Sequence, residues 1–180
     1  MSSDPNARAL AAPNTAVTAI TTMEVQRAVV ASRNSQRRRI ILPFHQGPEE
    51  SLHRMLNALQ PDSYIPPHRH LHPPKAETVL VLQGQLLCLV FDDSGTVRAS
   101  YLLRPGGDIF GFDCQAGIYH TFLAMAPDTV FFEVKPGPYQ AASDKDFPAW
   151  APHEGDPSAP AYLAGLRGLG MALVGRDSGV

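Results

Sequence analysis

A group of histidines near the middle of the chain has the spacing of a metal-binding pair. The segment His-Arg-His-Leu-His carries them at His68, His70 and His72. In an extended chain the side chains alternate between two faces, so His68 and His70 project the same way and their imidazoles can share one ion. His72 would join them only if the strand continued, and the prolines at positions 73 and 74 favour its ending there. We therefore predict that His68 and His70 are ligands and that His72 lies at the rim.

Two further donors stand at the beginnings of apolar segments. Glu77 opens the run ETVLVL, and His120 opens the run HTFLAMA after Gly117. Both runs predict strands, and the first residue of each can point into the same interior. Imidazole and carboxylate suit a divalent first-row metal, and four protein ligands leave up to two of six coordination positions for a ligand. Such histidines often form only hydrogen bonds, but four spaced donors favour one divalent ion (Zn, Fe, Ni or Mn) held by His68, His70, Glu77 and His120.

Short strands are the elements that must position these donors. Apolar and β-branched runs alternate with turns that contain glycine, proline or aspartate, and this spacing indicates a barrel or a sandwich. The predicted strands cover residues 52–60, 77–82, 85–91, 96–103, 118–125 and 129–135.

Helices are predicted only near the two ends of the chain. Thr21 followed by Glu24 is the signature of a capping box, so a short helix should cover residues 22–34. Residues 161–174 can form one terminal helix in spite of their glycines. The three arginines at 37–39 are interpreted as a solvated, flexible connector, and an anion site is the alternative.

The chain is therefore predicted to have four parts. These are a flexible tail over residues 1–20, a short helix and basic connector over 21–40, a β-barrel over 41–138, and a C-terminal extension with its helix over 139–180. The residues of the tail are mostly small and polar, so the tail can bury too little apolar surface to offset the entropy cost of ordering it. A length of 180 residues is enough for one domain with a sizeable core.

Charge and hydropathy argue against two classes of partner. The chain has 15 basic and 17 acidic side chains and a net charge of −2, so it lacks the strongly basic face that a nucleic acid requires. Its longest apolar runs, residues 79–82 and 86–91, are far shorter than the roughly 18 residues of a membrane-spanning helix. The N-terminus has no secretory signal pattern, which predicts a cytoplasmic location. Cys88 and Cys114 are expected to be buried thiols.

The donor spacing resembles the two motifs of the cupin superfamily. The matching residues are His68, His70, Glu77 and Gly84 for the first motif and Gly117 and His120 for the second. The gap between His70 and Glu77 is longer than usual, and Gln115 and Ala124 replace a proline and an asparagine. The resemblance implies a mainly β, single-domain cupin, a double-stranded β-helix or jelly-roll barrel, with the N-terminal helix and C-terminal extension predicted above. It also implies a homodimer, because cupins commonly pair through an edge strand.

A second resemblance covers about residues 22–160. The stretches RMLNALQPDSYIPPHRH, ETVLVLQGQ, FDDSGTV, GIYHT, KPGPY and DKDFPAWAPHEGD are similar to the WbuC-type cupin fold metalloproteins. Those small bacterial proteins are often associated with gene clusters for O-antigen and other surface polysaccharides, so the resemblance implies a link to polysaccharide biosynthesis. It implies no particular reaction. The stretch IILPFH departs from the family pattern, so the resemblance assigns no role to His45.

Several residues near the predicted ligands are candidates for contact with a substrate. Arg54, Arg69, Lys75 and Tyr119 qualify by proximity, although each can equally be a solvated charge or a wall aromatic. Strand alternation turns Arg69 away from the metal. Glu133 lies in the apolar run TVFFEVK, where it can face solvent, form an ion pair or act as an acid–base group. The catalytic candidates are therefore Glu133, Tyr119 and Lys75.

Three functions are compatible with this donor set. The first is a metal-dependent enzyme, of the isomerase, epimerase or dioxygenase type, acting on a small oxygen-rich molecule such as a sugar or hydroxy acid. The second is a non-catalytic sugar-binding or sensing module with a structural metal. The third is a metal-free barrel that binds an apolar ligand. A general base within reach of a bound ligand would favour the enzyme.

Overall fold

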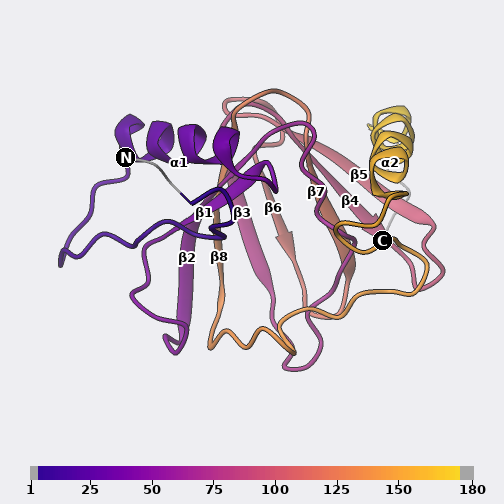
Figure 1. Cartoon of the computed structure of the whole chain (residues 1–180). Coiled ribbons are helices and arrows are strands. Elements are labelled where there is room, and N and C mark those ends of the chain that lie inside the picture. Colours follow the sequence, from indigo (N-terminus) through magenta and orange to yellow (C-terminus); the bar gives the residue numbers. More distant parts are fainter. Residues whose placement is uncertain (1–3, 175–180) are drawn as a thin grey trace.

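Eight strands form two antiparallel sheets, and a helix packs on the outer face of each sheet (Figure 1). The computed structural model describes residues 4–174. In chain order its elements are α1 (Thr22–Asn34), β1 (Arg39–Pro43), β2 (Leu52–Leu59), β3 (Glu77–Gln83), β4 (Leu86–Phe91), β5 (Val97–Leu103), β6 (Gly111–Cys114), β7 (Tyr119–Ala124), β8 (Thr129–Pro136) and α2 (Ala159–Leu173). The larger sheet has the order β1-β2-β8-β3-β6 and the smaller one β5-β4-β7. The predicted mainly β jelly-roll is confirmed.

The alternation of side chains along each strand builds the core between the sheets. In β3, Val79 and Val81 are buried on the inner face, whereas Leu80 is exposed on the outer face. Every residue of β4 is buried because both of its faces are covered. Cys88 points into the core between the sheets, and Leu89 packs in the cluster that contains α2. The cysteines at 88 and 114 are buried free thiols, as expected.

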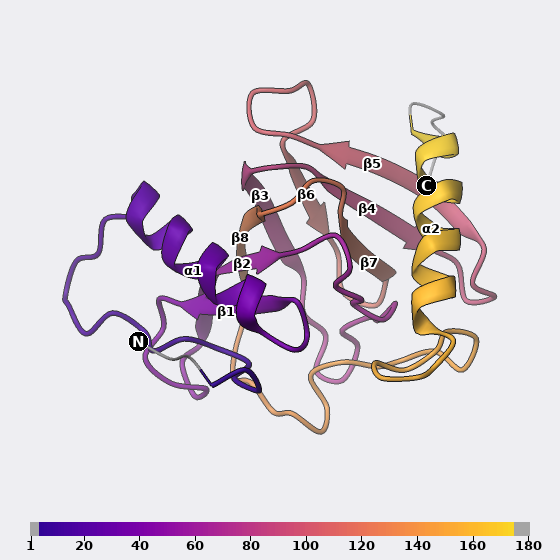
Figure 2. The same cartoon turned by 45° about the horizontal axis from the view of Figure 1, so that its top comes forward.

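The two helices lie close to the predicted ranges 22–34 and 161–174, on opposite sides of the barrel (Figure 2). The Thr21 capping box is present, since the Thr21 N–H donates to the Glu24 carboxylate at 3.1 Å. The apolar side of α1, including Val29, packs against Leu42 and Leu56 of the larger sheet. No helix within residues 4–174 is long and apolar enough to cross a membrane.

Two strands were not predicted, and one interpretation was wrong. Strand β6 is short and has no alternating pattern, so its pairing with β3 defines it. Strand β1 begins at Arg39, inside the segment interpreted as a solvated connector. Arg37 and Arg39 lie 2.7 and 2.8 Å from carboxylate oxygen Oε1 of Glu154. The carboxylate of a distant loop therefore orders these arginines, which the local sequence could not indicate.

The segment before α1 makes its own contact with the larger sheet. Ala9 forms a parallel bridge with Ile41, and the Leu10 N–H donates to the Ile41 carbonyl at 2.8 Å. Ala7 and Leu10 also pack against the apolar cluster beneath α1. Part of the first twenty residues thus protects the outer edge of β1, where unpaired backbone groups would otherwise remain.

Candidate metal centre

The segment that contains His68 and His70 lies beside the first residues of β7. The His68 N–H donates to the His120 carbonyl at 3.0 Å, and the His120 N–H donates to the His68 carbonyl at 2.9 Å. The Gly117 N–H donates to the His70 carbonyl at 3.0 Å. This antiparallel pairing shows that the segment is extended, and it brings the histidines of both motifs together.

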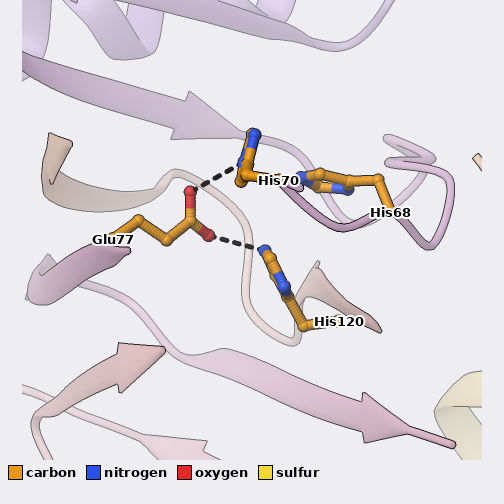
Figure 3. Close-up of side chains that lie close together, drawn as sticks. All are labelled: His68, His70, Glu77 and His120. Atoms are coloured by element: carbon orange, nitrogen blue, oxygen red, sulfur yellow. Dashed lines mark ion pairs between the residues drawn. The ribbon is translucent and has the colours of Figure 1, made fainter. Parts of the chain in front are cut away.

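Glu77 reaches the same point from the start of β3, on the inner face that also carries Val79. Its Oε1 lies 2.6 Å from His120 Nε2, and its Oε2 lies 3.4 Å from His70 Nε2 (Figure 3). One potential ligand atom from each of His68, His70, Glu77 and His120 lies within 4.8 Å of all the others, and all four residues are buried. The structure therefore brings together the four donors that the spacing predicted.

Backbone carbonyls hold the three imidazoles in one orientation. The Nδ1 atoms of His68 and His120 each lie 2.9 Å from the carbonyl two residues earlier in the chain, and Nδ1 of His70 contacts the Asp144 carbonyl. A carbonyl oxygen only accepts, so each Nδ1 carries the proton. In the neutral rings each Nε2 then presents its lone pair, and those of His70 and His120 face Glu77. This is the arrangement by which proteins orient metal-binding histidines.

The buried polar atoms of this cluster fit a cation. His70 Nε2, His120 Nε2 and Glu77 Oε1 have no hydrogen-bond partner in the described structure. Buried polar atoms are nearly always partnered, because an unpartnered one costs free energy. Nitrogen lone pairs that converge on a carboxylate repel unless a cation lies between them. The donor set and its unpartnered atoms therefore fit a divalent metal ion.

The charges of the cluster are strongly coupled. Burial favours the neutral imidazole of His120, but the Glu77 carboxylate overrides it and raises the pKa of His120 to about 10. Burial also disfavours ionised Glu77, yet His120 holds the pKa of Glu77 well below its usual range. The pKa of His68 lies well below its usual range because of burial and then the charge of Lys145. Without a metal ion, a proton on His120 is the cation that faces Glu77. A metal ion must displace this proton, so acid would weaken metal binding.

The other four histidines, at positions 45, 53, 72 and 153, lie outside the cluster. His72 is 76% exposed at its side chain, and its Nδ1 lies 3.7 Å from an Asp146 carboxylate oxygen. The chain turns at Pro73 and Pro74, which leaves His72 at the rim of the site, as predicted. His45 stacks on His53 with ring centres 4.0 Å apart. Both rings line the wall of a cavity that also reaches the cluster.

This cavity has a volume of about 760 Å³, which suits a small organic molecule. His68 and Glu77 form part of its wall. Apolar side chains such as Phe122 and Phe131 line it as well. The polar residues that line it include Asn57, Glu133, Lys135, Asp144 and Lys145. The cluster thus lies at the surface of a space that a ligand can occupy.

The three catalytic candidates occupy different environments. Glu133 is buried in the cavity wall, where it accepts a hydrogen bond from Asn57 at 2.7 Å and lies 3.2 Å from Lys135 Nζ. The ion pair foreseen for it is therefore present. Lys75 does not line the cavity, and its ammonium donates to an Asp144 carboxylate oxygen at 2.8 Å. Tyr119 does not line it either.

Strand alternation correctly turned Arg69 away from the cluster. Its guanidinium lies 4.4 Å from the centre of the Tyr119 ring and 3.3 Å from an Asp93 carboxylate oxygen. This cation–π contact explains the position of Tyr119, whose ring also forms a T-shaped contact with the Trp150 ring at a centre-to-centre distance of 5.8 Å. The guanidinium of Arg54, the remaining candidate, lies 3.2 Å from Glu50.

One wall of the site comes from the C-terminal extension, and the sequence did not predict that Lys145 contributes to it. Arg69 and Asp146 form an antiparallel bridge, with N···O distances of 3.1 and 2.9 Å. The bridge places Lys145 and Phe147 at the cavity, and the Phe147 ring centre lies 6.3 Å from that of His68. The local signals were the cluster of charges, DKD, and the aromatic residues Phe147 and Trp150 in a proline-rich segment.

Comparison with known proteins agrees with this architecture. L-ribose isomerase from Cellulomonas parahominis superposes with a TM-score of 0.51 and 18% identity, over 65% of this chain and 72% of that chain. CapF, a capsular polysaccharide assembling protein from Staphylococcus aureus, gives a TM-score of 0.50 and 18% identity, over 60% of this chain and 29% of that one. Both are cupin-fold proteins. This chain has the cupin fold.

A family model also matches part of the sequence. Residues 20–103 match the model of a family described as a domain of unknown function, DUF6016. No curated protein matches the sequence. The match spans α1 to β5 and so includes His68, His70 and Glu77 but ends before His120.

Proposed function

We propose that this cupin is a metal-dependent enzyme that acts on a small oxygen-rich molecule, a sugar or a hydroxy acid, within the cavity. The observation that carries the proposal is the convergence of imidazole Nε2 lone pairs on the Glu77 carboxylate at the cavity wall. The ligands would be His68, His70, Glu77 and His120. A bound divalent ion would supply Lewis-acid chemistry at a ligand oxygen.

The other residues of the cavity support binding and orientation. Phe122 and Phe131 present apolar surface that excludes water around the ligand. Glu133 is held by Asn57 and Lys135, so its carboxylate has a fixed position in the wall. From there it can accept a hydrogen bond from a ligand hydroxyl, and it is our candidate for proton transfer.

A metal analysis tests the proposal. The protein is purified without chelators or a polyhistidine tag, and metal content is measured for wild type, His70→Ala, His120→Ala and the control His72→Ala. We expect about one divalent ion per chain in wild type and in His72→Ala, because His72 lies outside the cluster. Both cluster variants should lose it. Retention in both cluster variants, or no uptake of Zn, Fe, Mn or Ni by wild type, would refute the proposal.

One observation favours the alternative of a non-catalytic sugar-binding module. Both oxygens of Glu133 already have protein partners, which leaves it less free as a general base. An experiment that distinguishes the two functions is to incubate the protein with L-ribose and other aldoses in D₂O and to follow the sugars by NMR. An enzyme would form the ketose or exchange the hydrogen next to the carbonyl, and Glu133→Gln would slow it. Binding without either change would favour the module.

The resemblance to WbuC-type proteins supports a finer proposal. We propose a cytoplasmic protein of surface-polysaccharide metabolism, and the name of CapF, a capsular polysaccharide assembling protein of the same fold, agrees with it. We also propose a homodimer. Strand β6 ends the larger sheet, and the apolar residues exposed beside it can pack against a second copy: Leu80, Leu82, Ile109 and Phe110.

A further inference from the structure

The segment 144–147 is fastened to the ligand-bearing segment at several points. The Asp144 carbonyl accepts the Nδ1–H of His70, and the bridge between Arg69 and Asp146 follows directly. The Leu71 N–H donates to an Asp146 carboxylate oxygen at 3.2 Å. Lys145 lies between these anchors, so its backbone has a fixed position beside the proposed metal ligands.

The ammonium of Lys145 has no counter-ion within residues 4–174. Lys145 is partly buried, lines the cavity and has no hydrogen bond or ion pair with any residue of the described part of the chain. Burial, and then the charge of Lys135, lowers the pKa of Lys145 to about 8. Its charge in turn lowers the pKa of His68, and both residues line the same cavity.

Three other basic side chains of the cavity wall, those of Arg37, Arg39 and Lys135, form ion pairs, and a fourth, that of Arg8, is exposed. Lys135 lies 3.2 Å from Glu133 and 3.5 Å from Asp144. Arg39 lies 2.8 Å from Glu154. Lys145 therefore adds a positive charge that the protein does not neutralise, and removing an ammonium from water without a partner is costly.

We propose that Lys145 binds an anionic group of the ligand, and that the ligand is a small carboxylate such as a hydroxy acid or an acidic sugar. The inference deepens the proposed function and rests on it for the site. A carboxylate would supply the missing counter-ion, and charge-assisted hydrogen bonds are among the stronger ones in proteins. A hydroxyl of the same molecule would be directed toward His68 and Glu77, which share the cavity wall with Lys145.

Matched pairs of probes test this assignment by titration calorimetry on the full-length protein. Each pair differs in a carboxylate: glycolate and ethylene glycol, gluconate and sorbitol, glucuronate and glucose. The variants are Lys145→Met, which removes the charge, Lys145→Gln as a second neutral variant, and Lys145→Arg, which keeps the charge. The control is Arg104→Met, because Arg104 is an exposed cation that does not line the cavity. Metal content is measured on the same samples.

We expect at least one acid to bind about tenfold or more tightly than its neutral partner in wild type. Both neutral variants should lose that preference and keep their metal, whereas Lys145→Arg and Arg104→Met should retain it. The assignment is overturned if no acid is preferred, or if a folded neutral variant keeps the preference.

The two proposals fail separately in this experiment. A wild type without metal refutes the proposed metal site, and its acid preference still reports on Lys145. A metal-loaded wild type whose acid preference survives in Lys145→Met and Lys145→Gln refutes the role of Lys145 alone.

Discussion

Backbone carbonyl groups set the proton positions on the three clustered histidines. Two of these carbonyls belong to neighbouring residues, but the one that orients His70 comes from Asp144, far along the chain. The Asp144 carboxylate is itself held by Lys75 at 2.8 Å. Lys75 therefore contacts the residue whose carbonyl orients His70.

The unpaired ammonium of Lys145 should cost stability at neutral pH. Below pH 8 the folded and unfolded chains both carry its proton, and the folded chain bears the full cost of the buried charge. Between pH 8 and its ordinary pKa of 10.5 the folded chain releases the proton, so the free energy of unfolding rises. Chemical denaturation of the metal-free protein at pH 7 should show Lys145→Met more stable by about 1–2 kcal/mol. An equal gain in Arg104→Met, or a loss in Lys145→Met, would contradict this account.

The same pKa predicts how acid binding depends on pH. Burial lowers the pKa of Lys145, and the charges of Lys135 and Arg39 lower it further. The carboxylates of Glu133 and Glu77 raise it, and the result is a pKa of about 8. The ammonium that binds a carboxylate is therefore largely lost by pH 9.5. Gluconate affinity, measured by calorimetry, should fall by about tenfold from pH 7 to pH 9.5. In Lys145→Arg the fall should be much smaller, and a flat profile in wild type would count against the assignment.

At the scale of elements, α2 depends on one glycine for its approach to the smaller sheet. A side chain at Gly170 would place its Cβ 2.7 Å from the Cδ2 atoms of Leu87 and Leu89, whereas Gly168 has nothing within 4 Å. The Ser100 hydroxyl also donates to the Gly170 carbonyl at 2.8 Å. The close contact fixes the angle of α2 on β4 and β5.

This contact predicts opposite effects of the same substitution two residues apart. Gly170→Leu should lower the free energy of unfolding by about 1–3 kcal/mol, because the added side chain collides with the sheet. Gly168→Leu should raise it by up to about 1 kcal/mol, because leucine favours helix more than glycine does. Thermal and denaturant unfolding measure both, and equal effects at the two positions would show that α2 does not pack through Gly170.

At the scale of the whole molecule, the two helices cover the outer faces of the sheets and leave the β6 side open. Phe110 is 56% exposed there, beside Leu80 and Leu82. If this surface joins two copies, wild type should be a dimer by light scattering, and Phe110→Lys should yield monomers. Val30→Lys is the matched control, since Val30 is 53% exposed on α1, which packs on β1 and β2 at the other end of the larger sheet from β6. A monomeric wild type would disprove the proposed dimer.

The whole barrel also explains why a polar cluster can lie inside an apolar core. Glu77 shares the inner face of β3 with Val79 and Val81, and His120 lies next to Thr121 in a strand that is buried throughout. The paired backbone of the two sheets fixes the positions of these side chains. A rigid scaffold of this kind can hold buried donors that would otherwise reorganise.

Local patterns were sufficient to predict six strands, both helices and the four clustered donors. Alternation along a strand places Glu77 on the side of Val79, and the spacing of His68 and His70 places both on one face, so short-range geometry carried this information. The capping box similarly identified the start of α1.

The remaining features depend on contacts between distant parts of the chain. Strand β6 exists through its pairing with β3, Arg39 is ordered by Glu154, and Lys145 reaches the cavity because Asp146 pairs with Arg69. None of these contacts leaves a periodic pattern in the nearby sequence. They arise when folding brings separate segments together. Only the tertiary structure therefore shows that the Lys145 ammonium, which we assign to ligand binding, lies at the cavity.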